Sequence, residues 1–264
     1  RERCDRGCRG TAMNADDVLF RVFPEARAGG FSRVDGTIAF YNRVNALVGP
    51  QSVVLDFGAG RGAGLVENRC EYRRSLLRLR GKVARVVGVD VDPAIFGNPG
   101  LDEAHRIEPG AALPLDDASV DLILADYVFE HIAEPERCAA ELDRVLRPGG
   151  WICARTPNRW NYVAVVARLV PERLHEKILG RVQPERKRED VFPAFYRMND
   201  LKTLRRLFPA ERYVDCSYCI SAEPAYLPRR VWIWRLALFL ERLLPDALQS
   251  NILFFAQKRP QPSR

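Results

Sequence analysis

The sequence lacks the regular cysteine spacing of a disulfide-stabilised or zinc-binding protein. Its seven cysteines are scattered along 264 residues and are odd in number, a pattern typical of a reducing compartment. Cys216 and Cys219 have the spacing of one half of a zinc site, but no second pair accompanies them, so we interpret them as strand or core residues. We therefore expect neither a disulfide framework nor a bound metal.

The sequence also has no internal repeat, no low-complexity tract and no apolar signal-peptide core at its start. Residues 1–12 are polar, rich in arginine and without periodicity. We expect them to be a disordered leader or an upstream extension, with translation beginning at Met13. The apolar stretch at 231–244 is too short to span a bilayer. The expected location is the cytoplasm, with contact to a membrane surface left open.

What the chain has in quantity is apolar residues and charge. With 47% hydrophobic and 28% charged residues, it is typical of a globular protein that buries a full core. Its length favours one α/β domain with an insertion over two independent domains. The net charge of +7 is compatible with an anionic substrate, a membrane surface or RNA, and selects none of them.

A glycine-rich stretch organises the rest of the chain. Val53-Val54-Leu55 is followed by Asp56, and glycine then stands at positions 58, 60, 62 and 64. Such an apolar run predicts a buried parallel strand that ends in a tight loop. Glycine permits positive φ and lets a ligand approach the main chain closely, and a helix after the loop would point its first N–H groups at that ligand. The pattern predicts a cofactor loop of the nucleotide-binding type.

Two acids distinguish between candidate cofactors. Gly58, Gly60 and Ala63 also fit the relaxed dinucleotide pattern. Asp56, however, stands where it would repel a pyrophosphate and attract an ammonium group. A second strand at 85–90 ends in Asp90, which is placed to accept hydrogen bonds from ribose hydroxyls. A ligand with a ribose, an amino group and a carboxylate but no phosphate fits S-adenosylmethionine better than NAD.

Hydrophobic periodicity and turn residues predict the other elements. Further strands are expected at 105–108, 120–128, 151–156, 212–220 and 251–256, and helices at 65–80, 134–146, 201–208 and 231–244. The apolar helix at 231–244 either packs against a lid, which is the preferred interpretation, or lies on a membrane surface that supplies a lipid-like substrate.

Four motifs in order resemble those of class I S-adenosylmethionine-dependent methyltransferases. They are Leu55-Asp56-Phe57-Gly58-Ala59-Gly60-Arg61-Gly62, Gly88-Val89-Asp90, Leu113-Pro114 with Ser119-Val120-Asp121-Leu122, and Leu146-Arg147-Pro148-Gly149-Gly150. More narrowly, the chain resembles the small-molecule branch of ubiquinone- and menaquinone-biosynthesis-like enzymes (methyltransferase type 11).

This resemblance implies an α/β fold: a Rossmann-like, doubly wound, seven-stranded and mostly parallel sheet with a helical insertion or lid. Residues 13–52 would form an N-terminal helical cap and 53–158 the core that binds S-adenosylmethionine. Residues 159–264 would supply the substrate lid and complete the sheet.

The resemblance and the residues together suggest a cofactor site. Its predicted members are Asp56, Gly58, Ala59, Gly60, Gly62, Asp90, Val91, Gly110, Ala111, Asp126 and Tyr127. The glycines would shape the cradle, Val91 would offer an apolar surface to the adenine, and Asp126 with Tyr127 would border the methyl group. The acid that family members place before the Leu-Pro pair is displaced here, so the backbone of Gly110 and Ala111, or a shifted Glu108, would contact the adenine.

Catalytic residues are less sharply indicated. His131 could take a proton from a hydroxyl acceptor, as histidine side chains commonly do at neutral pH, and Asp126 is a second candidate. Alternatively, Glu130-His131 is a structural part of the fold. Outside this region we interpret five residues as candidates to contact the substrate or the cofactor's carboxylate, with surface or core positions as the alternative: Arg33, Tyr41, Phe192, Phe195 and Tyr196. Arg197 could hold an anionic group of the substrate.

The predicted function is methyl transfer from S-adenosylmethionine to a small-molecule, lipid-linked or saccharide-linked acceptor, on oxygen. An RNA-modifying methyltransferase is an alternative because the chain carries 41 lysines and arginines. The sequence Asp126-Tyr127-Val128-Phe129 lacks the Asn/Asp-Pro-Pro-aromatic signature of amino methylation, so a nucleic-acid partner is not expected. A non-catalytic cofactor-binding protein is the other alternative.

Overall fold

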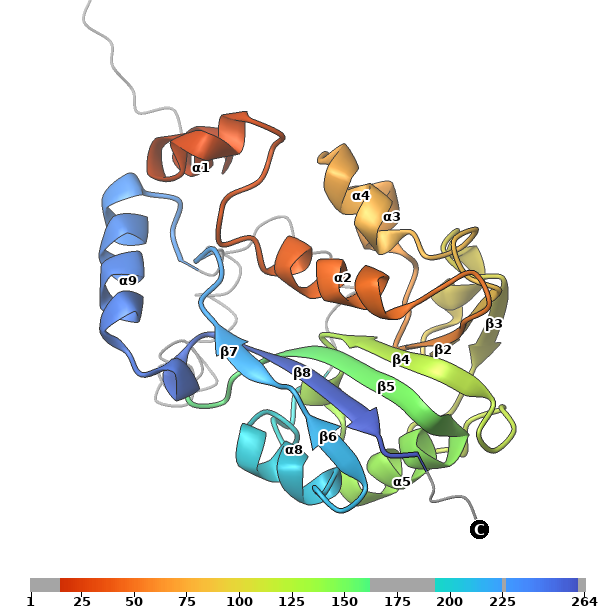
Figure 1. Cartoon of the computed structure of the whole chain (residues 1–264). Helices are drawn as coiled ribbons and strands as arrows, with labels where there is room; N and C mark the ends of the chain where they lie inside the picture. The colour runs from red at the N-terminus through yellow and green to blue at the C-terminus, as the bar shows by residue number, and fades with distance from the viewer. Residues whose placement is uncertain (1–14, 162–192, 225–226, 261–264) are drawn as a thin grey trace, which may run out of the picture.

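A mixed β-sheet forms the centre of the protein. The computed structural model describes residues 15–161, 193–224 and 227–260 (Figure 1). Within them the strand order is β3-β2-β1-β4-β5-β8-β6, with β7 beside β8. The strands are β1 (Val53–Phe57), β2 (Arg85–Asp90), β3 (Glu103–Arg106), β4 (Val120–Asp126), β5 (Leu146–Pro157), β6 (Tyr213–Asp215), β7 (Tyr218–Ile220) and β8 (Asn251–Lys258).

The first five strands are parallel, and β8 is antiparallel to β5, β6 and β7. Strand β1 lies between β2 and β4, so the strand order reverses at its carboxyl end. This is the point at which open α/β sheets bind ligands. The centre of β1 and β4 is buried on both faces, which explains why these strands are continuous apolar runs. The predicted doubly wound, mostly parallel sheet is therefore confirmed.

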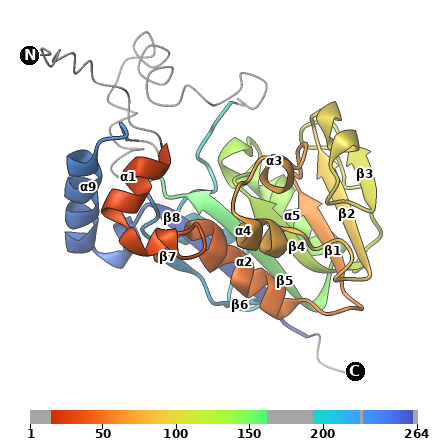
Figure 2. The same ribbon diagram turned by 90° about the horizontal axis from the view of Figure 1, so that it is seen from above.

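Helices cover both faces of the sheet (Figures 1 and 2). On one face α2 (Gly36–Leu47) and α4 (Glu71–Leu77) pack against β1, β4 and β8 through Phe40, Val44 and Leu76. On the other face α5 (Pro135–Val145) and α8 (Leu201–Leu207) pack through Leu142 and Leu204. The other helices are α1 (Ala15–Val22), α3 (Ala63–Val66) and α9 (Val231–Leu243). The 3₁₀ segments are η1 (Pro24–Arg27), η2 (Pro93–Gly97), η3 (Phe129–His131) and η5 (Asp246–Leu248).

Side-chain hydrogen bonds divide two of the predicted elements. The single helix expected at 65–80 is two helices, α3 and α4, and the Asn68 side chain accepts from the N–H of Cys70 between them. The single strand expected at 212–220 is split into β6 and β7, because the Ser217 hydroxyl accepts from the N–H of Phe255 in place of a backbone carbonyl. The sheet thus has eight strands in the described residues rather than seven. The edge strand β3 lies two residues before its predicted position.

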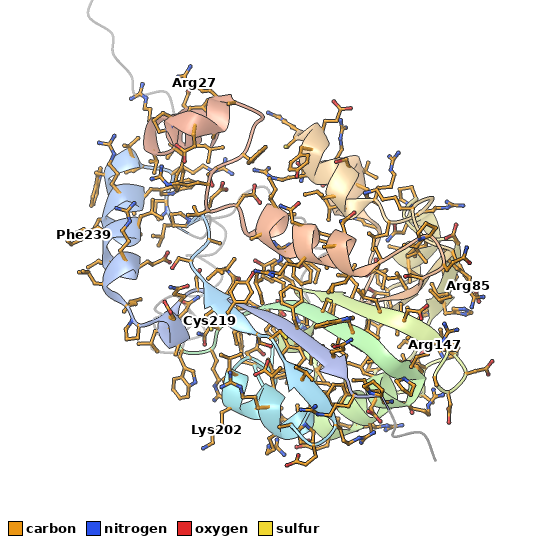
Figure 3. The ribbon with its side chains drawn as sticks, viewed as in Figure 1. Arg27, Arg85, Arg147, Lys202, Cys219 and Phe239 are labelled. Carbon is orange, nitrogen blue, oxygen red and sulfur yellow. The ribbon has the colours of Figure 1, made fainter. Side chains whose placement is uncertain are left out.

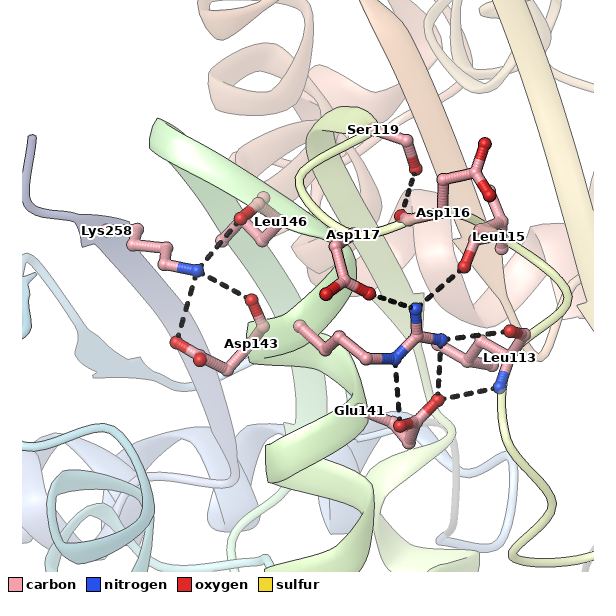
Figure 4. Close-up of polar contacts among 10 residues, drawn as sticks. Leu113, Leu115, Asp116, Asp117, Ser119, Glu141, Asp143, Leu146 and Lys258 are labelled. Atoms are coloured by element: carbon pink, nitrogen blue, oxygen red, sulfur yellow. Dashed lines mark hydrogen bonds and ion pairs between the residues drawn. The ribbon is translucent and has the colours of Figure 1, made fainter.

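Arg144 fixes the loop before β4 to helix α5. Its partners Leu113, Asp117 and Glu141 are labelled in Figure 4. Its guanidinium donates to the carboxylates of Glu141 and Asp117 and to the carbonyl of Leu113. The hydrogen bonds from Arg144 lower the pKa of Glu141. Nearby, the Lys258 ammonium donates to two carbonyls at the end of α5 and the start of β5. These contacts hold the Leu113-Pro114 motif and the last strand against the same helix.

Helix α9 lies at the margin of the molecule, beside α1 (Figures 1 and 2). One of its faces is buried with Val18, Phe23 and Ala26, and the buried side chains on it are Trp234, Ala237 and Glu241. The opposite face is exposed. The preferred interpretation that this helix packs against a lid stays a prediction, because residues 162–192 lie outside the described residues and the contact that the structure describes is with α1. In the part of the chain that the structure describes, no helix combines the length and apolarity needed to cross a membrane.

Candidate functional site

Three carboxylates converge at the carboxyl ends of neighbouring strands. Asp56, Asp90 and Asp126 lie at the tips of β1, β2 and β4. Burial, and then the charges of Asp126 and Asp90, raise the pKa of Asp56 from 3.8 to about 7. The ionised form of Asp56 is thus unfavourable in the protein alone, and a bound cation would stabilise it whereas a phosphate would not.

Asp126 is held by a buried arginine that the sequence analysis did not select. Arg155 on β5 donates from Nε to Asp126 Oδ1 at 2.7 Å and from Nη2 to Oδ2 at 2.8 Å. The third guanidinium nitrogen donates to the Thr37 hydroxyl at 3.0 Å, and the Tyr41 hydroxyl donates to Asp126 Oδ2 at 3.1 Å. Burial, followed by the charges of Asp126 and Asp56, raises the pKa of Tyr41 well above its ordinary value. Tyr41 is thus a neutral hydrogen-bond donor in this site.

Tyr127 is placed over this ion pair by a strained backbone. Its φ is +58°, a conformation that is uncommon for an aromatic residue and that clusters at functional sites. The Arg155 guanidinium lies 4.7 Å from the centroid of the Tyr127 ring, within the range of a cation–π contact. The Tyr127 hydroxyl donates to Asn251 Oδ1 at 3.1 Å. The aromatic ring is therefore fixed from both sides at the end of β4.

The glycine loop crosses the tips of β1 and β2. Gly58 donates its N–H to the Val89 carbonyl at 2.8 Å, and Gly60 donates to Asp90 Oδ2 at 2.8 Å. At φ +76°, a Cβ on Gly58 would overlap the side chain of Val128. Beside Gly60, which has φ +51°, no atom lies within 4 Å of the position a Cβ would take. The loop is packed at Gly58 and open at Gly60, as expected of a cradle that a ligand approaches.

Asn98 secures the loop from the side of η2. Its side-chain amide donates to the carbonyls of Ala59 and Gly60 at 2.9 and 3.1 Å. A Cβ on Gly62, which has φ +72°, would lie 2.5 Å from Asn98 Oδ1. The helix expected after the loop is only the single turn α3, so a helix dipole adds little here. The site depends on bare backbone and carboxylates instead.

The predicted adenine-binding residues lie beyond the tip of β2. Asp90 Oδ1 accepts from the N–H of Asp92 at 2.8 Å, and its backbone carbonyl accepts from Ile107. Val91 is partly buried. Gly110, at φ +73°, and Ala111 lie in the turn after β3, where Ala111 donates to the Glu108 carbonyl. The first part of this loop is thereby anchored to Asp90.

His131 and its neighbour have different surroundings. Glu130 is buried and accepts from the Thr156 hydroxyl at 3.0 Å, which in turn accepts from Asn199 at 2.7 Å. His131 Nδ1 lies 2.8 Å from the carbonyl oxygen of Pro193. Since a carbonyl only accepts, Nδ1 carries a proton, and Nε2 is the basic nitrogen of the neutral ring.

The other residues predicted to contact the substrate do not all lie at the site. Tyr41 reaches the site, whereas the exposed Arg33 pairs with Glu25 at 3.2 Å. Phe195, which is 45% exposed, and Tyr196 donate their N–H groups to the Glu130 carbonyl. Arg197 donates to the carbonyl of Ala133 and lies over the Phe195 ring, and Phe192 lies outside the described residues.

The sequence analysis did not select two of the residues that complete the site, although one of them stands out in the sequence. Arg155 is a charged residue inside an otherwise apolar strand, where burial requires a partner of opposite charge. Asn98 had no such signal, because its role depends on the path of a loop. Cys216 and Cys219 are free, and no cluster of metal-ligating side chains occurs within the described ranges.

Comparison with known proteins identifies a related domain. Residues 55–154 match the family model described as a methyltransferase domain. A Mycolicibacterium smegmatis protein named "Probable S-adenosylmethionine-dependent methyltransferase" is 38% identical over 112 residues, which cover 40% of this chain and 38% of that protein. The chain thus spans about two fifths of the length of this curated relative.

Two solved structures share the fold. A SAM-dependent methyltransferase from Archaeoglobus fulgidus is 16% identical, with a TM-score of 0.52 over 83% of this chain and 92% of that chain. The geranyl diphosphate C-methyltransferase of Streptomyces coelicolor, in complex with Mg²⁺, geranyl diphosphate and S-adenosyl-L-homocysteine, is 19% identical, with a TM-score of 0.50 over 83% of this chain and 77% of that chain. The fold is the Rossmann-like methyltransferase fold, and the matches support S-adenosylmethionine as the cofactor.

Proposed function

We propose that this chain, whose residues 55–154 match the methyltransferase domain family, is an enzyme that transfers a methyl group from S-adenosylmethionine to a small-molecule, lipid-linked or saccharide-linked acceptor, on oxygen. The observation that carries this proposal is the convergence of three carboxylates around an open glycine loop, with Arg155 paired to one of them. A ligand with an ammonium and a sulfonium group fits such a site, and a pyrophosphate does not.

The residues present fit S-adenosylmethionine part by part. Asp56 would receive the ammonium group, Asp90 the ribose hydroxyls, and the open backbone at Gly60 the body of the ligand. Val91 and the turn at Gly110 and Ala111 would enclose the adenine. The bound cofactor supplies a methyl group on a positively charged sulfur.

The contribution of the protein to the reaction is alignment, exclusion of water and proton removal. Asp126 engages Arg155 with both of its oxygens, which favours a positioning role for this carboxylate at the methyl group. His131 is the better candidate for the general base, because Asp126 is engaged by Arg155 and the contact of Nδ1 with the Pro193 carbonyl orients the imidazole. Tyr127 would border the transferred methyl.

A binding titration tests the first half of the proposal. The protein should bind S-adenosylmethionine stoichiometrically and should not bind NADH. Uptake of NADH without any heat from S-adenosylmethionine would refute the assignment. Radiolabelled methyl transfer to the lipid, polysaccharide and RNA fractions of a lysate then identifies the acceptor class. Label in RNA would favour the nucleic-acid alternative, and tight binding without label in any fraction would favour a non-catalytic protein.

His131→Ala tests the proposed base once an acceptor is found. Turnover at neutral pH should fall by about 10²–10⁴-fold, while the affinity for S-adenosylmethionine stays unchanged. His105→Ala is the matched control, because this partly exposed imidazole on β3 pairs with Glu103 and lies outside the proposed machinery. Full turnover of His131→Ala across pH would show that the histidine is structural.

A further inference from the structure

Helix α9 presents a continuous apolar surface to solvent. We define its outer face by five side chains that are 49–66% exposed: Trp232, Leu236, Phe239, Leu240 and Leu243. Phe239 points away from the rest of the protein in Figure 3. Among the described residues, twelve large hydrophobic side chains are exposed, and five of them belong to this face. An accumulation of this kind on one helix marks an interaction site, whereas exposed apolar residues scattered singly do not.

The outer face is opposite the surface with which α9 contacts the protein. At about 100° per residue, its five side chains fall within an arc of about 100°. The buried side chains Trp234, Ala237 and Glu241 fall on the other side of the same wheel. One side of this helix is therefore buried against α1 and the segment that follows it. The other side, which is equally apolar, contacts no other element among the described residues.

Positive charge borders one edge and the N-terminal end of the outer face. Arg235 and Arg242 are exposed and lie about 20° apart along one edge of it. Arg229 and Arg230 immediately precede the helix, and Arg21 of α1 lies close enough for its carbonyl to accept from Arg235 at 3.3 Å. The one acid of the helix, Glu241, is buried on the inner face. An apolar face bordered by arginine is complementary to a surface that is apolar inside and anionic outside.

We propose that the outer face of α9 docks this protein on a membrane surface that contains anionic phospholipid. Trp232 and Phe239 enter the boundary between head groups and acyl chains, and Arg235 and Arg242 contact the phosphates. A second copy of this chain fits less well, because an isologous contact would bring the same arginines of both copies together. The proposal does not depend on methyl transfer.

Sedimentation with lipid vesicles tests the proposal on the full chain. The protein should bind vesicles of phosphatidylcholine mixed with phosphatidylglycerol, bind phosphatidylcholine alone more weakly, and dissociate as salt is raised. Phe239→Glu combined with Leu243→Glu should weaken binding by at least about tenfold. Arg235→Gln and Arg242→Gln should each weaken binding to the anionic vesicles by about fivefold.

Phe96→Glu is the matched control, because Phe96 is 67% exposed in η2, which contacts β2 and β3. It should leave vesicle binding unchanged. A second readout requires no destabilising change: brominated lipid should quench the tryptophan fluorescence of the unaltered protein, and Trp232→Phe should remove most of that quenching while sedimentation persists.

Several results would overturn the proposal. They are failure of the unaltered protein to bind either vesicle, binding that the α9 variants do not weaken, and a concentration-dependent dimer that Phe239→Glu dissociates. Binding of S-adenosylmethionine, measured on the same samples, reports separately on the proposed function and should be the same in all α9 variants.

Discussion

At the scale of single residues, the site is a group of carboxyl groups that the fold brings together and that a single arginine only partly neutralises. Asp56 is a partly buried acid near two other acids, and Arg155 compensates Asp126 alone through direct contact. The remaining negative charge is unfavourable for the protein by itself and favourable for a cationic ligand. Two predictions follow from the titration of Asp56 and from the partner of Asp126.

The first prediction concerns the pH dependence of stability. Because the fold raises the pKa of Asp56 from 3.8 to about 7, the native state retains a proton that the unfolded chain has already released. The contribution of Asp56 to the free energy of unfolding is therefore largest below about pH 4, declines as pH rises towards 7, and levels off above. Asp56→Asn should remove this decline and be more stable than the unaltered protein at pH 8 by roughly 2–4 kcal/mol.

Urea unfolding of both proteins between pH 4 and pH 8 provides the measurement. The affinity for S-adenosylmethionine should change in the opposite sense, rising with pH as Asp56 ionises and falling about tenfold or more in Asp56→Asn. Parallel stability curves for the two proteins across this range would contradict the raised pKa.

The second prediction concerns the buried ion pair. Arg155→Met leaves the Asp126 carboxylate without its cation and close to Asp56, so the free energy of unfolding should fall by about 3–5 kcal/mol at neutral pH. Adding Asp126→Asn to this variant should restore a large part of the loss, because no uncompensated charge then remains. The free energy of unfolding of the unaltered protein, the two single variants and the double variant, measured by thermal or urea unfolding, forms a double-mutant cycle. Additive losses would mean that the two side chains are not coupled.

At the scale of elements, the glycine loop joins a packed position to an open one. Gly58 is enclosed by Val128, Gly60 faces free space, and both have positive φ. Asn98 ties the loop to η2 through two carbonyls. The same substitution at the two glycines should therefore have different consequences.

Gly58→Ala should lower stability by about 1–3 kcal/mol, because the new methyl group overlaps Val128, and Val128→Ala should relieve much of that loss. Gly60→Ala should have a smaller effect on stability, limited to the strain of positive φ, and should abolish most S-adenosylmethionine binding by filling the open cradle. Differential scanning calorimetry and a binding titration distinguish the two effects. Unchanged affinity in Gly60→Ala would mean that the ligand does not pass over this residue.

At the scale of the whole molecule, the core extends well beyond the segment that matches the methyltransferase family. Residues 55–154 include β2 to β4 and most of β1 and β5. Strand β8, near the other end of the sequence, pairs with β5 along seven residues and contributes Ile252, Leu253, Phe254 and Phe255 to the core. The N-terminal helix α2 covers the same sheet and supplies Tyr41 to the site.

We therefore predict that a fragment of residues 55–154 does not fold by itself. Without β8, strand β5 becomes an unprotected edge, and the apolar side chains that face α2 and β8 become exposed to water. Circular dichroism and the amide proton spectrum of the fragment should show an unfolded or aggregated chain. A fragment of residues 15–260 is the control and should retain the cooperative transition of the full chain. A dispersed spectrum from the shorter fragment would show that its core is autonomous.

Much of the fold could be predicted from the sequence, because in the central strands the local residue pattern favours the same structure that the tertiary contacts stabilise. The apolar runs ending in Asp56 and Asp90 predicted parallel strands and a ligand at their tips, and both strands occur as expected. Predictions were wrong where a side chain replaced a backbone hydrogen bond, as Asn68 and Ser217 do. Hydrophobic periodicity contains no information about such local competition.

The roles of Asp56, Asp90, His131 and the adenine-facing loop stay predictions, now with defined surroundings. The sequence by itself determined the strands β1 and β2, the acids at their carboxyl ends and the glycine loop, because these follow from residue type and spacing along short stretches. Only the tertiary structure decided that Arg155, Tyr41 and Asn98 complete the site and that one face of α9 is left in solvent. Those outcomes depend on which distant surfaces meet, and the free energy of such contacts is not encoded in any local pattern.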